Sequence, residues 1–174
     1  YQIHWGRRDA SWFRGMFGKS KKYLAIGPLW SSHVQSLPRV RALLKDRQAQ
    51  EKIKTVTAIA VFDTSFNLGA PYDGLGAQEF FDAIRELFDR PAWSSCLLLY
   101  KPKNDLALVR QGASIQMAAS LDRLLAHPRC VLLDPEMSPE AVIAEADLTI
   151  SMAFTSTTVE ALGARRSALY FDPR

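Results

Sequence analysis

Short β-rich runs alternate with helical periodicity from residue 55 to the end of the chain. Residues 55–62, 95–100, 130–133, 148–151 and 168–171 are dominated by apolar and β-branched side chains, a pattern typical of strands covered on both faces. In 76–89 and 117–125, apolar residues recur at helical spacing, and shorter helices are expected after Ser138 and from Thr157. Strands and helices that alternate at this spacing predict right-handed βαβ units and a parallel sheet.

The predicted fold class is therefore α/β, a doubly wound, Rossmann-like sheet with helices on both faces. Ligands of such sheets bind beyond the carboxyl ends of the strands. The loop after the first strand lacks G-x-G-x-x-G, and no G-x-x-x-x-G-K-[ST] motif occurs, which argues against a dinucleotide site and a P-loop. Residues 23–26 are interpreted as a linker strand or a sheet edge.

Charge divides the chain of 174 residues into two parts. Residues 1–54 carry twelve Lys and Arg against three Asp and Glu, a net charge of +9 mixed with aromatic residues, whereas 55–174 carry a net charge of −5. We therefore expect an amino-terminal appendage or linker over 1–54 and a Rossmann-like domain over 55–174. The sequence has no starting Met and stops just after a predicted strand, so we expect a fragment of a longer protein.

The cysteines and histidines exclude several kinds of site. Cys96 and Cys130 each lie in a β-like run, and no C-x-x-C pair occurs, so two buried thiols in a reducing compartment are expected, with no structural zinc. No apolar run approaches the roughly 20 residues that a membrane-spanning helix needs. The expected location is the cytoplasm.

Polar residues follow the first two strands, where a ligand is expected to bind. The first strand leads into Thr64, Ser65 and Asn67, and the second into Lys101-Pro102-Lys103, two cations separated by a rigid proline. Either the two lysines contact a phosphate or they belong to an ordinary solvated loop.

Four consecutive hydroxyl residues follow the fourth strand: Thr155, Ser156, Thr157 and Thr158. Their hydroxyl groups and the free backbone N–H groups at a helix start would bind a pyrophosphate well. Glu160 lies one turn further on, where a carboxylate can accept hydrogen bonds from both hydroxyls of a ribose. The alternative is purely structural, because Thr157-x-x-Glu160 is also a capping box.

The last third of the chain holds the segment 146–151 (Ala-Asp-Leu-Thr-Ile-Ser), the hydroxyl cluster, Glu-Ala-Leu at 160–162, and Phe-Asp-Pro at 171–173. With these motifs the chain resembles the carboxyl-terminal nucleotide-binding half of GT-B glycosyltransferases. Lys101-Pro102-Lys103 is similar to the Lys-x-His-Pro of bacterial capsule, surface-polysaccharide and polyol-phosphate transferases, with Lys103 where His would fall. The resemblance spans residues 23–172.

The resemblance implies a donor, an acceptor and a set of roles. The donor would be a nucleotide-activated sugar or polyol phosphate of unknown base, and the acceptor a glycan or a lipid-linked acceptor, with no cofactor and no obligatory metal. Thr155, Ser156, Thr157 and Thr158 would bind donor phosphates and Glu160 the ribose, while Lys101 or Lys103 would offset the charge of the leaving diphosphate. No catalytic base is assigned, because the acceptor half is expected to lie outside this chain.

The sequence also departs from the family pattern. The first of two glutamates that retaining members place eight positions apart is Met152 here, and the usual Gly and Pro that follow are Arg165 and Ser167. Two alternatives therefore stay open: a sugar-nucleotide epimerase of the same fold, and a Rossmann-like domain that binds or scaffolds without catalysis. Absence of a D-x-D motif argues against the other major glycosyltransferase fold.

The basic, aromatic residues of 1–54 have three interpretations. They pack on a missing half, they contact anionic lipid headgroups as a peripheral protein at the inner face of the membrane, or they bind nucleic acid. Packing on the missing half is favoured. Nucleic acid is not expected as a partner, because the net −5 of the remaining chain opposes a surface that tracks phosphates.

Overall fold

The computed structural model of the chain describes residues 38–53, 56–64, 74–152 and 155–172, together with two short strands near the amino terminus. These two strands, β1 (Gln2–His4) and β2 (Tyr23–Ala25), pair in parallel as a sheet of their own. Tyr23–Ala25 therefore do not form an edge of the main sheet, so that interpretation of this segment is wrong.

The main sheet has five parallel strands in the order β5-β4-β3-β6-β7. They are β3 (Thr57–Phe62), β4 (Cys96–Lys101), β5 (Cys130–Leu132), β6 (Leu148–Met152) and β7 (Ser167–Phe171). From the central strand β3, the chain adds β4 and then β5 on one side. It then returns to the other side of β3 and adds β6 and then β7. This confirms the predicted doubly wound fold and places the topological switch point between β3 and β6.

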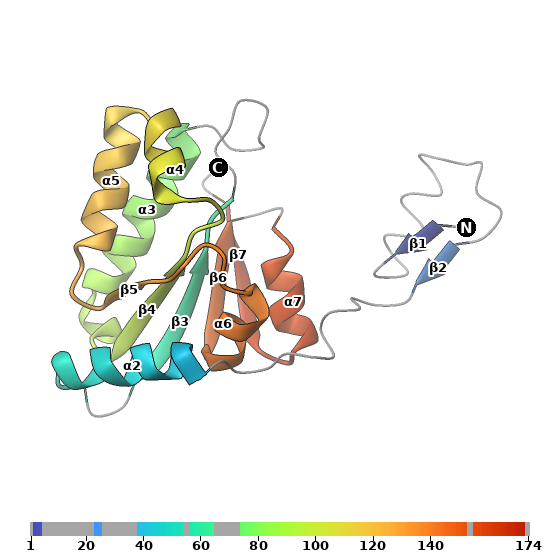
Figure 1. The fold of residues 1–174 in the computed structure, drawn as a ribbon, viewed down its shortest axis with the longest axis horizontal. Helices are drawn as coiled ribbons and strands as arrows, with labels where there is room; N and C mark the ends of the chain where they lie inside the picture. Colours follow the sequence, from blue (N-terminus) through green and yellow to red (C-terminus); the bar gives the residue numbers. More distant parts are fainter. Residues whose placement is uncertain are drawn as a thin grey trace.

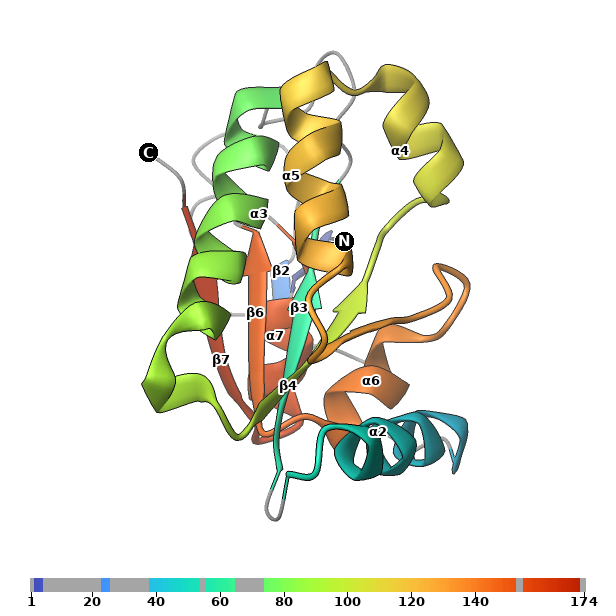
Figure 2. The ribbon, with the colours of Figure 1, turned by 90° about the vertical axis from the view of Figure 1, so that its left-hand side faces the viewer.

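Helices cover both faces of the sheet (Figures 1 and 2). On one face lie α3 (Gly74–Asp89), α4 (Leu106–Gly112) and α5 (Ile115–Leu125), and on the other α2 (Pro38–Gln50), α6 (Pro139–Glu145) and α7 (Thr157–Gly163). A short 3₁₀ helix, η2 (Pro91–Trp93), leads from α3 into β4. The predicted helices over 76–89 and 117–125 correspond to α3 and α5.

The alternation of side chains along each strand produces two separate cores. Ile59, Val61 and Tyr100 point toward α3 and α5, where they pack with Phe80 and Phe81, whereas Ala60 and Phe62 point toward α2, α6 and α7. Both cores are apolar clusters. Several buried polar side chains adjoin the second core, among them Thr149, Ser151, Thr157, Thr158 and Glu160.

One helix of the second core comes from the segment predicted as an appendage. Val40 of α2 is fully buried, and Leu43 and Leu44 pack against the same cluster. The apolar positions of α2 are few among Arg, Lys and Gln, which is why its sequence shows little helical periodicity. The hydrophobic core thus extends into residues 38–50.

Helix α4 was also not predicted, because it has only seven residues and none of them is buried.

Helix boundaries follow from local capping. Ser138 is the N-cap of α6, as predicted, and its Oγ accepts a hydrogen bond from the backbone N–H of Ala141 at 3.3 Å. Ser114 caps α5 in the same way through Met117 N–H at 3.1 Å. Cys96 and Cys130 are free and buried in neighbouring strands, as expected for structural thiols.

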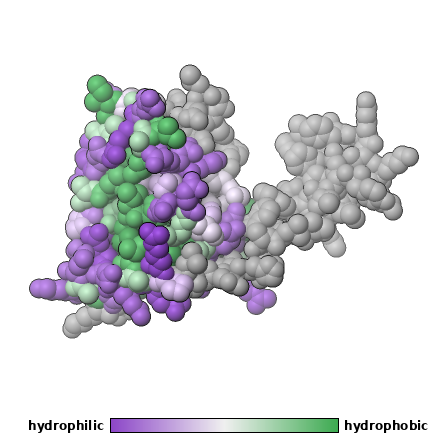
Figure 3. Space-filling view, in the orientation of Figure 1, coloured by the Kyte–Doolittle hydropathy of each residue, from purple (hydrophilic) through white to green (hydrophobic). Residues whose placement is uncertain are grey.

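The face of the described part that Figure 3 shows carries hydrophilic residues around its margins. In this view, hydrophobic residues gather in a band between α5 and α6, over the β5 edge of the sheet. Within the residues that the structure describes, no helix combines the length and apolar character that crossing a membrane requires.

Candidate functional site

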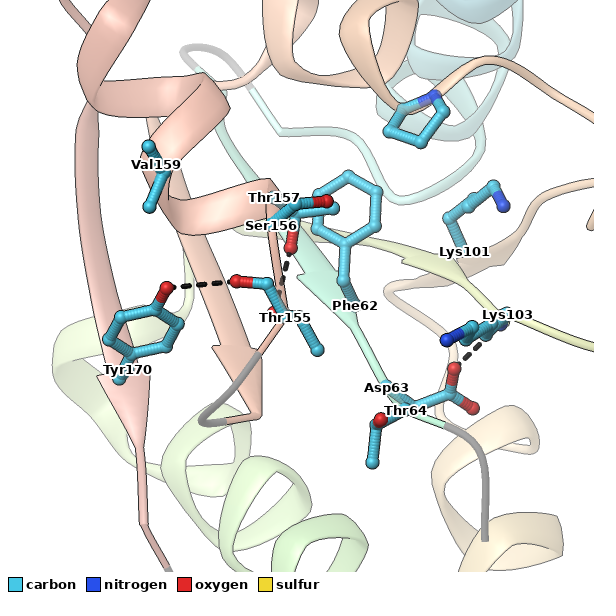
Figure 4. Close-up of a pocket in the computed structure, with 11 residues that line it drawn as sticks. Phe62, Asp63, Thr64, Lys101, Lys103, Thr155, Ser156, Thr157, Val159 and Tyr170 are labelled. Atoms are coloured by element: carbon cyan, nitrogen blue, oxygen red, sulfur yellow. Dashed lines mark hydrogen bonds between the residues drawn. The ribbon is translucent and has the colours of Figure 1, made fainter. Parts of the chain in front are cut away.

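A cavity of about 560 Å³ lies at the carboxyl ends of the strands, beside the switch point between β3 and β6 (Figure 4). That volume is within the range of roughly 300–1,000 Å³ found for small-molecule sites. Eleven residues line it: Phe62, Asp63, Thr64, Lys101, Lys103, Pro139, Thr155, Ser156, Thr157, Val159 and Tyr170. The loops after β3, β4 and β6 therefore meet at one site, as the parallel topology predicts.

The β4 side of the pocket is cationic. Lys101 is the last residue of β4, is 7% exposed, and lines the cavity together with Lys103. Burial lowers the pKa of Lys101, while the nearby carboxylates of Asp63, Glu136 and Asp134 act in the opposite direction. A partly buried ammonium group that faces a cavity attracts anions more strongly than a solvated one.

The β3 side contributes a buried carboxylate. Asp63 follows β3 directly and is 4% exposed. Its Oδ2 accepts a hydrogen bond from the Tyr100 hydroxyl and its Oδ1 one from the Lys103 backbone N–H, each at 2.6 Å. Burial raises the pKa of Asp63 to about 6, although both hydrogen bonds and the two lysines favour the ionised form.

The β6 side contributes hydroxyl groups that form a network. Thr157 Oγ1 lies 2.7 Å from Ser151 Oγ and 3.1 Å from Thr155 Oγ1, and Thr155 Oγ1 donates to the Met152 carbonyl at 2.9 Å. From β7, the Tyr170 hydroxyl donates to the Thr155 carbonyl at 2.8 Å (Figure 4). These bonds fix the loop between β6 and α7 against its neighbours.

Two predicted residues lie beside the pocket rather than in its lining. Thr158 is buried, and its hydroxyl donates to the Leu169 carbonyl at 3.4 Å. Glu160 is 6% exposed, and its Oε2 has no hydrogen-bond partner. Burial raises the pKa of Glu160, and the nearby Glu140 carboxylate raises it further. A hydrogen bond from the Ser156 side chain lowers the pKa and partly opposes this shift.

The capping-box alternative is wrong in its geometry. Helix α7 begins at Thr157 with Ser156 as the N-cap residue, and no side-chain capping bond forms there. Thr157 Oγ1 instead contacts Ser151 and Thr155. Glu160 is therefore one position too far along the helix to complete a capping box, and it bonds the side chain of the N-cap residue Ser156 instead.

The remaining predicted residues divide in two groups. The structure brings Thr64, Lys101, Lys103, Thr155, Ser156 and Thr157 to one cavity. Ser65 and Asn67 lie outside the described residues.

Asp63 and Tyr170 belong to the pocket but were not among the predicted site residues. Asp63 is the polar residue directly after the first strand, a position that the strand pattern alone marks as a candidate. Tyr170 lies inside a strand, and nothing in the local sequence shows that its hydroxyl reaches the β6–α7 loop. Within the described residues, no group of three or more His, Cys, Asp or Glu side chains is placed to hold a metal ion.

Comparison with family models gives one result that covers the full chain. All 174 residues match the model described as "Polysaccharide biosynthesis PFTS motif protein". The chain belongs to this family. Read in one-letter code, PFTS differs in its first letter alone from Ala153-Phe154-Thr155-Ser156, and the last two of these residues line the pocket. No match was found among curated protein sequences.

Solved structures of TagF, a wall teichoic acid polymerase, share the fold. A TagF variant soaked with CDPG superimposes with a TM-score of 0.53 at 14% identity, over 98% of this chain and 37% of that one. The same variant alone gives a TM-score of 0.52 at 14% identity, over 98% and 39%, and TagF itself gives 0.53 at 14%, over 98% and 38%. The PFTS chain thus spans less than two fifths of the length of these proteins.

The family match and the TagF superposition together confirm the resemblance inferred from the sequence. The chain is a domain of a polysaccharide biosynthesis family and has the fold of TagF. At 14% identity, the superposition establishes the fold and leaves the chemistry of the pocket to be argued from its own residues.

Proposed function

We propose that this domain binds the nucleotide-activated donor of a glycosyltransferase that builds a polysaccharide. The donor is a nucleoside diphosphate sugar or a nucleotide-linked polyol phosphate. The observation that carries the proposal is the pocket itself, in which Lys101 and Lys103 line one side and the hydroxyl loop with Thr155 and Ser156 lines the other (Figure 4).

The pocket suits a diphosphate because it offers positive charge from one side and hydroxyl groups from the other. The two lysines supply positive charge and N–H donors next to the cavity. Ser156 and Thr157 line the other side with hydroxyl groups that already take part in hydrogen bonds, to Glu160 and within the network of Ser151, Thr155 and Thr157. Thr155 already uses its hydroxyl hydrogen toward Met152, so it acts by fixing the loop and by offering an acceptor. Thr158 has the same supporting role through Leu169.

Glu160 is assigned to the ribose of the donor. Its orphaned Oε2 is a buried acceptor with no partner in the described part of the chain, and a ribose hydroxyl would satisfy it. Glu160 lies beside the cavity, and the apolar side chains of Phe62, Pro139 and Val159, which line it, supply surface for the nucleobase or the sugar.

Transfer breaks the bond between the activated carbon or phosphorus of the donor and the nucleotide oxygen, and negative charge then develops on the departing nucleotide. Fixed cations stabilise this charge without reorganising, because they are held in place before the reaction. Lys101 and Lys103 have this role here. No catalytic base is assigned, and the acceptor, a glycan or a lipid-linked acceptor, is assigned to a part of the protein outside this pocket.

Of the alternatives, the epimerase has less support from the pocket. Such an enzyme uses carboxylates or histidines in contact with the sugar. Among the described lining residues, Asp63 is the carboxylate and no histidine is present, and both oxygens of Asp63 are held by protein donors.

Contact of the basic segment 1–54 with an anionic membrane stays a prediction, as does a cytoplasmic location.

A ligand panel tests the proposal. Thermal-shift titrations of the chain with UDP, CDP, GDP, ADP and CMP are expected to show a saturable rise in Tm with one base. At 100 times its Kd, a ligand adds about 2.7 kcal/mol to the free energy of unfolding, a shift of several degrees for a chain of this size. Absence of any shift, together with absence of calorimetric heat at millimolar nucleotide, would contradict the proposal.

The variant Lys101→Met/Lys103→Met sharpens the test, because methionine keeps the apolar stems and removes both charges. We expect affinity for the nucleoside diphosphate to fall about 100-fold, from two lost charge-assisted contacts, and affinity for the nucleoside to stay nearly constant. Arg39→Ala/Lys45→Ala on the exposed side of α2 is the matched control, since it removes the same charge away from the pocket. Equal losses for diphosphate and nucleoside would rule out the phosphate contact.

A further inference from the structure

The Asp63 carboxylate ties the end of β3 to the end of β4. Its Oδ2 accepts from the Tyr100 side chain and its Oδ1 accepts from the backbone N–H of Lys103, both at 2.6 Å. Lys103 comes two residues after Lys101, with Pro102 between them, so this backbone bond anchors the whole Lys-Pro-Lys segment.

The anchor is itself rigid because Tyr100 is part of the core. Tyr100 is fully buried, and its ring packs edge-on against Phe81 at a centroid distance of 6.0 Å. A hydroxyl held by such a ring keeps its position whether or not a ligand is bound. Asp63 therefore links the aromatic core to the cationic side of the pocket.

A buried carboxylate at this place has a cost that a buried amide would not have. Desolvation disfavours its ionised form, and a protein that needed only the two hydrogen bonds would not require a titratable group. The lysines next to Asp63 compensate for its charge, so the three groups form one electrostatic unit at the mouth of the pocket.

We propose that Asp63 is a positioning residue that holds Lys101 and Lys103 for an anionic donor and takes up a proton when the donor binds. The inference rests on the proposed function, since the ligand that drives it is the diphosphate of the donor. Asp63 acts through the lysines and is not itself a catalytic residue.

The electrostatics fix the sign of the effect. Within the described part of the chain, the charged or titratable groups that act on Asp63 are Tyr100, Lys101 and Lys103, and Asp134 and Glu136 act in turn on Lys101. With Asp63 ionised, its charge and those of the two lysines sum to +1. A bound diphosphate diester brings two negative charges to the same place, which favours protonation of the carboxylate.

The size of the effect follows from linkage. The pKa of Asp63 without ligand is about 6, so about one tenth of the molecules hold the proton at pH 7. An upward shift of about one unit, the lower end of what a nearby charge produces, raises that fraction to about one half. We therefore expect an uptake of about 0.4 protons at pH 7 and an affinity that falls about tenfold between pH 5 and pH 8.5.

Calorimetry in buffers with different ionisation enthalpies measures the uptake directly. The probes are UDP-glucose, CDP-glycerol and GDP-mannose, diphosphate diesters that exchange no proton of their own near neutral pH, and the one that binds tightest is used. Wild type is expected to take up about 0.4 protons at pH 7 and to lose this uptake by pH 8.5. Uptake at Lys101 would instead grow toward alkaline pH, so the pH profile separates the two groups.

Two variants identify the group. Asp63→Asn should bind without the proton uptake near pH 7. Tyr100→Phe preserves the packing and removes the hydrogen bond that lowers the pKa of Asp63, so its uptake should have a maximum at higher pH. Carbon-13 NMR of the aspartate carboxyl groups in wild type gives the same titration without any substitution that affects folding.

The outcomes separate the two proposals. The role of Asp63 would be overturned if wild type and Asp63→Asn took up the same number of protons when they bind a diester. It would also be overturned if the ligand did not shift the carboxyl signal of Asp63. Either result would leave the donor pocket intact. Wild type that binds none of the three diesters and none of the nucleotides in the thermal-shift panel would overturn the proposed function, and the present inference with it.

Discussion

The two faces of the sheet are built from different kinds of side chain. Between the sheet and α3 and α5, Phe80, Phe81 and Phe88 are fully buried and pack with Tyr100 and Leu121. Between the sheet and α6 and α7, the apolar cluster adjoins Thr149, Ser151, Thr157, Thr158 and Glu160, all buried. Thr149 Oγ1 and Glu160 Oε2 lack partners on that second face, within the described residues.

This difference indicates a division of work. Large aromatic side chains bury the most apolar surface, so the α3–α5 face contributes most to the free energy of folding. Buried polar groups contribute little or cost stability, and each orphaned atom costs about 1–3 kcal/mol. On the α6–α7 face, buried polar groups lower the free energy of unfolding and lie next to the pocket. This is consistent with a ligand-binding role for them.

Phe80→Ala is expected to have the largest effect on stability. Its ring is fully buried and lies 5.4 Å from Phe171 and 5.7 Å from Phe81, centroid to centroid. We expect a loss of about 4 kcal/mol in the free energy of unfolding, measured by urea denaturation. Nucleotide affinity of the molecules that remain folded should not change, because Phe80 belongs to the α3–α5 core.

Phe80→Leu is the milder control, with an expected loss well below that of the alanine variant. If Phe80→Ala reduced affinity as strongly as it reduced stability, the two faces would be coupled and the proposed division would fail.

The α3–α5 face was predictable from the sequence to a large extent, and the reason is periodicity. Large apolar residues recur at helical spacing in α3, namely Phe80, Phe81, Ile84 and Phe88, and long apolar runs mark the strands of the sheet. Helices α2 and α4 escaped prediction for the opposite reason. The few apolar side chains of α2 lie among cations, and α4 is too short for a period to show.

The pocket was predictable in part. Strand ends in a parallel sheet meet at one edge, so Lys101 and Ser156 could be expected to lie near each other without knowing any side-chain contact. Hydrogen bonds such as Asp63 to Tyr100 and Tyr170 to Thr155 join residues from different elements. No spacing in the sequence encodes such pairs, and only the strand order, which places β3 beside β4 and β6 beside β7, brings them together.

Glu160→Gln tests the buried polar face. Glutamine keeps the shape and removes the charge that burial disfavours, so we expect stability to change by less than about 1 kcal/mol and affinity for the ribonucleotide to fall about tenfold. The measurement is calorimetry with a ribonucleoside diphosphate and with its 2′-deoxy analogue.

Comparison of the two nucleotides is the control for Glu160. If Glu160 contacts the ribose hydroxyls, the variant and the 2′-deoxy change remove the same interaction, and their effects will not add. Fully additive losses would place Glu160 away from the ribose and leave its burial without a ligand to explain it.

Tyr170→Phe is expected to have the smallest effect and asks how firmly the pocket loop is held. The hydroxyl donates to the Thr155 carbonyl at 2.8 Å, and the side chain is 45% exposed, so water replaces much of the lost bond. We expect a stability loss of about 0.5–1 kcal/mol and a two- to threefold weaker diphosphate affinity, on the order of what one neutral hydrogen bond contributes. Hydrogen exchange at the backbone N–H groups of α7 should rise in the variant, because its first turn loses a tether to β7. Unchanged exchange, with unchanged affinity, would mean that the hydroxyl network of Ser151, Thr155 and Thr157 fixes the loop without help from β7.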